Sequence, residues 1–294
     1  MNCWPGTVLA LLATLGCAGA SDLPAGANLT EEATVPVGPE PALVSFGSGD
    51  ATLQGWLYKP EGEGPFPAVI YNHGSDKVPG WFPTLGQFWT ARGYVLFVPH
   101  RRGHGRSPGD WIVDLQRKFR ETEKDETRAQ KHDIELHERA NADVVAAVAW
   151  LKLQPFVNTN ALIMSGISYG GIQTVLAAEK DLSVKAFIAF APAAMSWLGN
   201  PLLRERLLQA VKNAQTPMFL LQATNDYNLG PSELLGKELE RKGPPNRAKV
   251  YPAYGDPADH QAGHGGFAVR GSEIWGADVM KFLGAVLERG GGGR

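Results

Sequence analysis

At 294 residues and 44% hydrophobic content, the chain is long enough to bury a sizeable core in one large α/β domain or two smaller domains. Its net charge of -2 and the lack of a dense basic cluster argue against a nucleic-acid partner. The 2 cysteines are Cys3 and Cys17, so the chain beyond them offers no disulfide, thiolate metal site or cysteine nucleophile.

Residues 1–20 have the pattern of a secretory signal segment. Residues 7–15 are almost wholly apolar but too few to span a bilayer, and residues 18–20 have the small-x-small form of a signal-peptidase site, although no lysine or arginine precedes them. Cys17 follows Leu-Gly as in a bacterial lipoprotein box, but Thr14 stands where that motif usually has leucine. We therefore expect export to the periplasm or the outside of the cell, with cleavage after Ala20 favoured over lipidation. A membrane is an expected partner only if Cys17 is lipidated.

The next segment, residues 21–41, is rich in Pro, Gly, Ala and Thr without periodicity, which indicates an extended or disordered leader. The folded domain is predicted to begin near Ala42. Two strands, 43–46 and 51–58, flank a Gly-Ser-Gly-Asp turn there and predict an antiparallel hairpin.

From residue 67 onward, short apolar segments alternate with segments of helical spacing. The expected strands are 67–72, 94–98, 161–165, 186–190, 216–222 and 247–251, and the expected helices are 83–92, 141–153, 169–180, 201–213, 231–242 and 272–289. Such alternation is typical of a largely parallel sheet with helices on both faces. With the hairpin, it predicts one α/β-hydrolase domain over residues 42–289 that contains a mostly parallel eight-stranded sheet, followed by a disordered tail at 290–294.

One segment, residues 112–140, does not fit this alternation. Between Asp114 and Arg139 it carries eight acidic and seven basic residues and almost no apolar stripe, so we expect a solvated helix or a mobile insertion. An exposed connector is the simpler interpretation. A lid over the site is the alternative, because the segment follows the fourth strand, whose C-terminal end lies at the edge where functional loops gather.

The strand at 161–165 leads into Gly166-Ile-Ser168-Tyr169-Gly170, which fits the G-x-S-x-G pattern of a nucleophile elbow. In such an elbow the glycines allow a strained turn, which exposes the Ser168 hydroxyl and aims the Tyr169 N–H at a developing oxyanion. The pattern recurs at residues 105–109, but a proline follows Ser107 and no helical pattern comes after it, so we interpret that match as a turn. A glycine-rich structural turn is the alternative at Ser168.

A serine nucleophile needs a base and an acid that orients the base, and in this fold the chain order is serine, acid, histidine. Asp226 follows the 216–222 strand in a polar loop and is the predicted acid, with a turn or helix cap as the alternative. His260 and His264 both follow the last strand, and their order cannot separate them. His264 is favoured as the base, because the glycines around it allow the loop to bend toward Ser168.

A second oxyanion donor is expected in the loop after the 67–72 strand. Gly74 lets the chain turn there, and the N–H of Gly74 or Ser75 can point inward. His73 has no partners at metal-ligand spacing, so we assign it to packing or loop support. His100 and His104 are four residues apart but lie in a glycine loop and not on one helical face. Neither a metal nor an organic cofactor is expected.

Three tryptophans, Trp81, Trp111 and Trp197, fall on or next to loops that leave C-terminal strand ends. Packing is the default role for such side chains, and lining of an apolar substrate pocket is the alternative. An altered ester chain-length profile in Trp81→Ala and Trp197→Ala would distinguish the two.

Several motifs, taken together, resemble the dienelactone-hydrolase-like group of α/β-hydrolases, near the serine peptidases related to prolyl oligopeptidase. These motifs are His73-Gly74, residues 102–107, residues 166–171, Asn225-Asp226-Tyr227 and Gly263-His264-Gly265. The resemblance covers roughly residues 42–289. It implies a Ser168–Asp226–His264 triad and an oxyanion hole that uses Tyr169 and the loop at Gly74.

The sequence therefore predicts an exported serine hydrolase that cleaves small-molecule carboxylic esters through an acyl-enzyme intermediate. A small serine peptidase or amidase is the runner-up. A non-catalytic surface binding protein on a hydrolase scaffold is a remote alternative.

Overall fold

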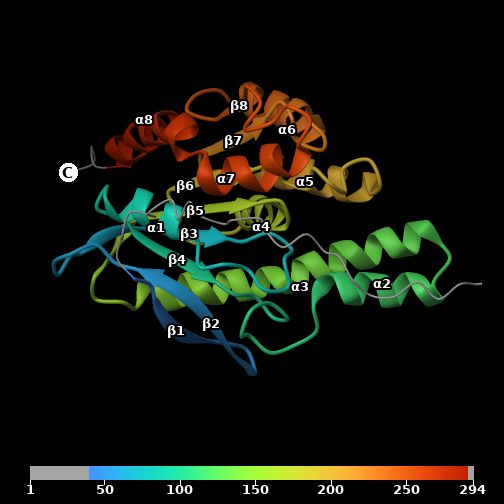
Figure 1. Cartoon of the computed structure of the whole chain (residues 1–294), viewed down its shortest axis with the longest axis horizontal. Coiled ribbons are helices and arrows are strands. Elements are labelled where there is room, and N and C mark those ends of the chain that lie inside the picture. The colour runs from blue at the N-terminus through green and yellow to red at the C-terminus, as the bar shows by residue number, and fades with distance from the viewer. Residues whose placement is uncertain (1–39, 291–294) are drawn as a thin grey trace, which may run out of the picture. The chain divides into compact units, whose positions relative to one another are not determined.

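The computed structural model describes residues 40–290 (Figure 1). The expected signal segment, all but the end of the expected leader and the last four residues of the tail lie outside the described residues. Within residues 40–290, no helix is long and apolar enough to cross a membrane.

The eight strands form a single sheet in the order β1-β2-β4-β3-β5-β6-β7-β8. β1 pairs antiparallel with β2, and β2 pairs antiparallel with β4, while all the other neighbours are parallel. The predicted eight-stranded α/β-hydrolase sheet with its N-terminal hairpin is thereby confirmed. The strands are β1(Ala42–Ser48), β2(Ala51–Tyr58), β3(Phe66–Asn72), β4(Val95–Pro99), β5(Val157–Ile167), β6(Ala186–Phe190), β7(Met218–Ala223) and β8(Arg247–Tyr251).

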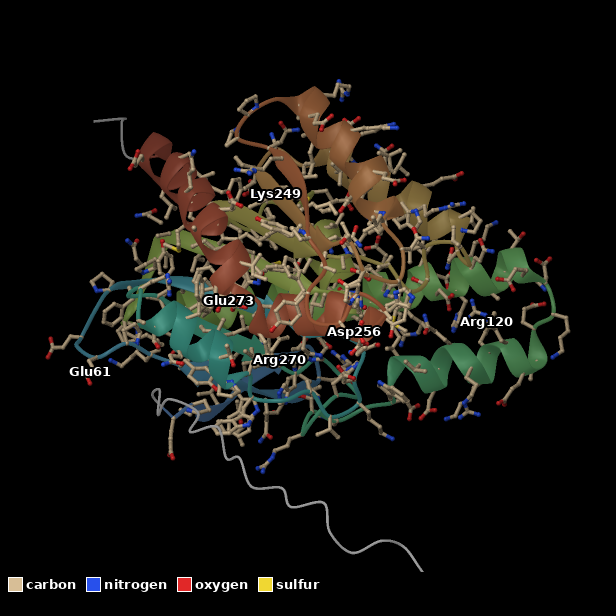
Figure 2. All side chains as sticks on the ribbon, turned by 45° about the horizontal axis from the view of Figure 1, so that its top comes forward. Glu61, Arg120, Lys249, Asp256, Arg270 and Glu273 are labelled. Atoms are coloured by element: carbon tan, nitrogen blue, oxygen red, sulfur yellow. The ribbon has the colours of Figure 1, made fainter. Side chains whose placement is uncertain are left out.

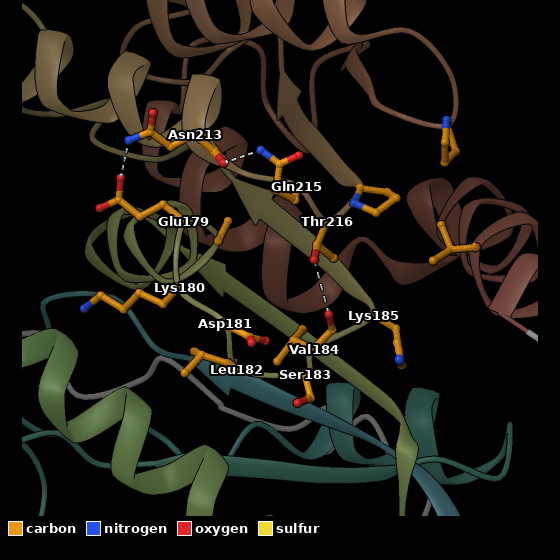
Figure 3. Close-up of a pocket in the computed structure, with 14 residues that line it drawn as sticks. Glu179, Lys180, Asp181, Leu182, Ser183, Val184, Lys185, Asn213, Gln215 and Thr216 are labelled. Atoms are coloured by element: carbon orange, nitrogen blue, oxygen red, sulfur yellow. Dashed lines mark hydrogen bonds between the residues drawn. The ribbon is translucent and has the colours of Figure 1, made fainter.

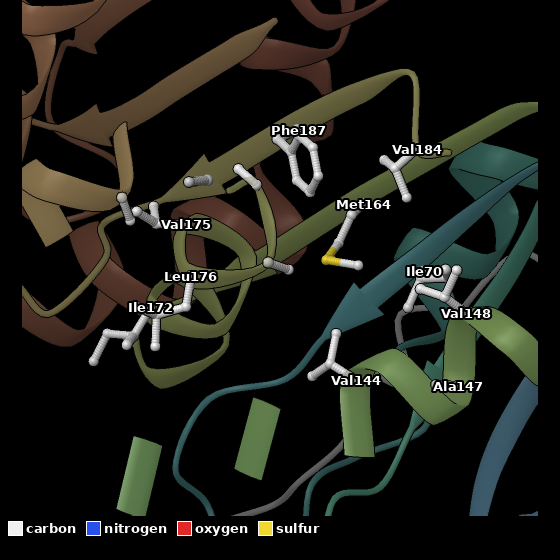
Figure 4. Close-up of a cluster of buried hydrophobic side chains, with 14 of the residues drawn as sticks. Ile70, Val144, Ala147, Val148, Met164, Ile172, Val175, Leu176, Val184 and Phe187 are labelled. Atoms are coloured by element: carbon white, nitrogen blue, oxygen red, sulfur yellow. The ribbon is translucent and has the colours of Figure 1, made fainter. Parts of the chain in front are cut away.

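Helices cover both faces of the sheet, and each face has its own hydrophobic core. One core packs strand side chains against α3, α4, α5 and α6, and the other packs the alternate strand side chains against α1, α7 and α8. Figure 4 shows part of the first core, in which Val148 of α3 lies beside Ile70 of β3. The helices are α1(Pro83–Thr90), α2(Ile112–Thr122), α3(Glu126–Lys152), α4(Tyr169–Ala177), α5(Pro201–Asn213), α6(Gly230–Lys242), α7(Phe267–Arg270) and α8(Ser272–Gly290), with a π-helical turn, η1(Ala262–Gly266), before α7.

The charged segment 112–140 is the main difference from the prediction. It forms α2 and the first half of α3, so the helix expected to start at 141 begins at Glu126, where the Asp125 side chain accepts a hydrogen bond from the Arg128 N–H and caps it. The two helices form a hairpin, in which they lie side by side (Figure 1). The hairpin has a buried face, because Ile112 and Leu136 both join the hydrophobic core. Its apolar residues are too few to reveal this face as a stripe in the sequence.

This topology places the loops that carry the predicted site residues at the C-terminal ends of the strands. Because β3, β4, β5, β6 and β7 are parallel, the loops that follow them leave the sheet at the same side. Ser168, Asp226 and the Gly74 loop all lie in such loops, so the edge at the C-terminal strand ends is where a site can form.

Candidate active site

Ser168 stands at a sharp turn between β5 and α4. Its φ of 56° and ψ of -116° are rarely adopted by residues other than glycine, as expected for a strained nucleophile elbow. A Cβ on Gly166 would lie 2.4 Å from the Gly170 carbonyl oxygen, and a Cβ on Gly170 would lie 1.9 Å from that of Asn72. The two glycines of the motif are therefore required by the close approach of α4 to β5 and β3.

Asp226 and His264 form a buried pair. The Nδ1 of His264 lies 2.8 Å from Oδ1 of Asp226, and the side chains are 4% and 1% exposed. The carboxylate also accepts hydrogen bonds from the Gln222 amide (3.1 Å) and the Tyr227 N–H (2.6 Å). With Nδ1–H donated to Asp226, the opposite ring nitrogen, Nε2, is a base, and it has no hydrogen-bond partner among residues 40–290.

The other histidine of this loop takes a different position. His260 is exposed, and its Nδ1 lies 3.1 Å from the backbone oxygen of Asn225, so His260 does not contact the Asp226 carboxylate. His264 lies in the π-helical turn η1, which carries its ring to Asp226.

Asn225 joins the acid loop to the histidine loop, and no local pattern pointed to this role beyond its place in the Asn225-Asp226-Tyr227 motif. Its amide nitrogen donates to the backbone oxygens of Tyr254, Asp256 and Asp259, each at 3.0 Å. A Cβ on Gly263 would lie 2.4 Å from the Asn225 side-chain oxygen. Asn225 therefore fixes the turn that carries His264 against the loop that carries Asp226.

The expected oxyanion donors lie next to Ser168. A Cβ built on Gly74 would lie 4.0 Å from the Ser168 Cβ, and Tyr169 is the first residue of α4. The backbone N–H groups of Ser75 and Tyr169 donate to no acceptor within residues 40–290. Unpaired N–H groups beside a nucleophile are what an oxyanion needs, and the helix N-terminus adds a favourable dipole.

A buried cation, Arg101, holds both of these donor segments, and the sequence did not single it out. It is 1% exposed, and its Nη2 donates to the backbone oxygens of His73 (2.7 Å) and Gly74 (3.0 Å). Its guanidinium carbon lies 4.4 Å from the centre of the Tyr169 ring. No carboxylate of the described residues forms an ion pair with Arg101, and its Nε and Nη1 have no hydrogen-bond partner there.

Four buried histidines surround Arg101 and Tyr169. Burial, with Arg101 adding to it, lowers the pKa of His100 to about 4, that of His104 to about 3 and that of His137 to about 4, and it lowers the pKa of His73 well below its ordinary value. All four are therefore neutral at pH 7. Across residues 40–290, no group of three or more His, Cys, Asp or Glu residues has the arrangement of a metal site.

A cavity of about 110 Å³ opens at Ser168, between the Gly74 loop, the α2–α3 hairpin and α5. Ser75, Ser168 and Tyr169 are among the residues that line it. A larger cavity, about 650 Å³, lies at the opposite ends of the strands, where residues 178–185 and 213–217 lead into the N-terminal ends of β6 and β7 (Figure 3). That cavity contains none of Ser168, Asp226 and His264. The cavity at Ser168, and not the larger one, is therefore the candidate for a substrate site, because it contains the predicted nucleophile.

None of the three tryptophans lines the cavity at Ser168. Trp81 is half exposed, and Trp197 is buried in the core, where its ring packs against Gly230. The indole N–H of Trp111 donates to the backbone oxygen of Ser75 (2.7 Å). Trp111 therefore supports the loop of the expected oxyanion donors.

The second G-x-S-x-G match has a structural role. The Ser107 hydroxyl donates to the backbone oxygen of His100 (2.7 Å) and accepts from the Gln54 N–H (3.0 Å). Ser107 thereby holds the loop after β4 against β2, in agreement with its interpretation as a turn.

Comparisons with known proteins point to one superfamily. The model of the X-Pro dipeptidyl-peptidase (S15) family matches residues 48–240. A curated relative, the polyketide transferase grgF of a Penicillium species, is 29% identical over 220 residues, and the match covers 69% of this chain and 66% of the relative.

Solved structures with similar folds include peptidases and esterases. An acylaminoacyl peptidase of Pyrococcus horikoshii matches with a TM-score of 0.61 and 22% identity over 85% of this chain and 42% of its own. The esterase Pf2001 of Pyrococcus furiosus matches with a TM-score of 0.59 and 17% identity over 84% of this chain and 91% of its own. The chain thus spans less than half of the peptidase and just under two thirds of the curated relative. At these identities the structural matches show a shared α/β-hydrolase fold.

Proposed function

We propose that this chain, which belongs to the X-Pro dipeptidyl-peptidase (S15) family of α/β serine hydrolases, cleaves carboxylic esters through an acyl-enzyme intermediate. Ser168 is the proposed nucleophile, His264 the base and Asp226 the acid that orients it. Support comes from the strained elbow at Ser168 and from the buried pair in which His264 lies 2.8 Å from Asp226.

In the proposed first step, the Ser168 oxygen bonds to the ester carbonyl carbon while its proton passes to Nε2 of His264. The N–H groups of Tyr169 and of Gly74 or Ser75 stabilise the negative oxygen that forms. Collapse of this intermediate breaks the ester C–O bond, and His264 returns the proton to the leaving alcohol. Water then attacks the acyl carbon and gives a proton to His264, and as the bond between this carbon and the Ser168 oxygen breaks, His264 passes the proton to Ser168 and the acid is released.

One observation favours an ester over the N-terminal dipeptide that the family description names. Release of a dipeptide from a peptide N-terminus requires the acyl side of the site to hold an ammonium group. Among residues 40–290, Asp133 is the one carboxylate that lines the cavity at Ser168, and Arg120 already binds both of its oxygens, at 2.9 and 2.5 Å. A neutralised carboxylate gives an ammonium little attraction.

The purified full chain, assayed with short p-nitrophenyl esters and with aminoacyl anilides beside Ser168→Ala, tests the proposal. We expect ester turnover that falls by about 10⁴-fold or more in the variant. Anilide turnover without ester turnover would instead support a peptidase or amidase, the alternative that the family match favours. Absence of both, without fluorophosphonate labelling of Ser168, would refute a serine hydrolase of either kind.

A further inference from the structure

We propose that the cavity of about 110 Å³ at Ser168 is an acyl pocket that accepts short, uncharged acyl groups of about four or five non-hydrogen atoms. The proposal rests on the ester hydrolysis proposed above and names the substrate class of that site.

The position of His264 decides which half of an ester enters the cavity. His264 must give its proton to the leaving alcohol, so the alcohol lies next to His264 in any productive complex. The cavity is lined by Ser168 and by the proposed oxyanion donors Ser75 and Tyr169, but not by His264. The group on the other side of the carbonyl, the acyl chain, is therefore the one that enters.

The volume sets the length of the chain. A protein cavity of about 150 Å³ lined by aliphatic side chains holds benzene, which has six non-hydrogen atoms. By proportion, about 110 Å³ holds four or five such atoms. Apolar side chains from four parts of the chain form the wall: Ile112 and Val113 of α2, Ile172 of α4, Ala193 after β6, and Leu203 of α5.

The polar residues of the cavity carry no net charge to attract a charged acyl group. Asp133 is paired with Arg120, and His137 is neutral at pH 7 because burial lowers its pKa to about 4. An acyl chain that ends in an ammonium or a carboxylate would lose its hydration without gaining an opposite charge.

Contacts around Asp133 fix the dimensions of the cavity. Asp133 of α3 accepts from Arg120 of α2 and from the Asn200 amide (3.3 Å), and the Asn200 side-chain oxygen caps α5 by accepting from the Leu203 N–H (2.9 Å). Figure 2 shows Arg120 between the two helices of the hairpin. The α2–α3 hairpin and α5 are thus linked, and the charged segment forms a fixed wall of the pocket.

The chain-length profile of kcat/KM tests the pocket, measured with p-nitrophenyl esters from acetyl to decanoyl. We expect the full chain to prefer butyryl to hexanoyl esters and to cleave decanoyl esters at least tenfold more slowly. Leu203→Ala removes three wall carbons and should move the maximum to longer chains by about two or three methylenes. Ala193→Leu should move it to acetyl.

Leu207→Ala is the matched control, because Leu207 is a buried leucine of the same helix that does not line the cavity. It should leave the profile unchanged even if it lowers stability, and circular dichroism checks that each variant folds. Leu203→Val replaces Leu203→Ala if the latter fails to fold.

The two proposals fail in different ways. Ester turnover with the same profile in the native chain, Leu203→Ala and Ala193→Leu would overturn the acyl pocket and leave ester hydrolysis standing. Equal turnover of decanoyl and butyryl esters would do the same. Absence of ester turnover in the native chain would refute ester hydrolysis, and the pocket proposal with it.

Discussion

At the scale of single residues, contacts across the fold distinguish side chains that are alike in sequence. His260 and His264 are four residues apart in one loop, but His264 meets the Asp226 carboxylate, whereas His260 meets the Asn225 backbone. A base needs an oriented, buried ring, and only His264 of the two has one.

The two histidines therefore make a matched pair for mutation. We expect His264→Gln to lower kcat/KM for a short ester by about 10⁴-fold or more, because it removes the proposed base. His260→Gln should change it less than threefold, since its ring is exposed and lies against the Asn225 backbone oxygen and the Tyr227 ring, not against the Asp226 carboxylate. Steady-state kinetics check both, and a large loss in His260→Gln alone would reverse the assignment.

We expect Arg101 to be a positioning residue, and its effect on activity can be measured apart from any effect on stability. We expect Arg101→Met to lower kcat about ten- to a hundredfold with little change in KM, because the Gly74 loop and Tyr169 lose the group that holds them both. Stability should stay level or rise, because the substitution removes a buried cation without an ionic partner. Kinetics and urea unfolding check the two effects.

Arg101→Lys keeps the positive charge but lacks the planar guanidinium group. Its kcat should therefore lie between that of Arg101→Met and that of the native chain. A loss of kcat that tracks a loss of folding free energy across the two variants would show that Arg101 is merely structural.

At the scale of elements, the α2–α3 hairpin shows how a charged segment can be structural. Arg120 and Asp133 join the two helices through two hydrogen bonds, and the Asp133 side chain is 7% exposed. Arg117, three residues before Arg120 on α2, makes ion pairs with Asp114 and Glu121 at the surface. One helix therefore offers an ion pair with a buried carboxylate and ion pairs with exposed ones for comparison.

We expect Arg120→Ala to lower the free energy of unfolding by about 1–3 kcal/mol, because Asp133 is left buried without its cation. Arg117→Ala, the control, should cost less than about 0.5 kcal/mol because exposed ion pairs contribute little. Urea denaturation measures both. Equal effects would mean that the Arg120–Asp133 contact does not hold the hairpin.

At the scale of the whole molecule, the buried histidines make stability depend on pH. His100, His104 and His137 have pKa values of about 4, 3 and 4, below the value of about 6.5 of an unfolded histidine. Below pH 6.5 the unfolded chain therefore binds more protons than the native chain does. Each histidine contributes stability that is fully present above pH 6.5 and is lost as the pH falls toward its native pKa.

We expect the free energy of unfolding to fall between pH 6.5 and 4, with a slope that approaches about 1.4 kcal/mol per pH unit for each of these histidines. Urea denaturation at a series of pH values measures the slope. His137→Phe should make it shallower, because one buried group no longer takes up a proton on unfolding. A stability that stays constant from pH 7 to 4 would contradict this account.

The sequence by itself determined the eight strands, most of the helices and the elbow at Ser168. Strand and helix periodicity, and a glycine motif between a strand and a helix, are local patterns that neighbouring residues specify. It also predicted that Asp226 follows β7 and that the two histidines follow β8, because the topology of a parallel sheet orders the loops along the chain.

Only the tertiary structure decided which histidine meets Asp226, that Arg101 bridges the two donor segments, and that the segment 112–140 forms a wall of the cavity. Each of these depends on contacts between residues far apart in the sequence, such as His264 with Asp226 and Arg101 with Gly74. Burial sets the chemical state of such groups, because it keeps the histidines neutral and leaves unpaired N–H groups available as donors. Burial is a property of the assembled fold, so no local pattern could reveal it.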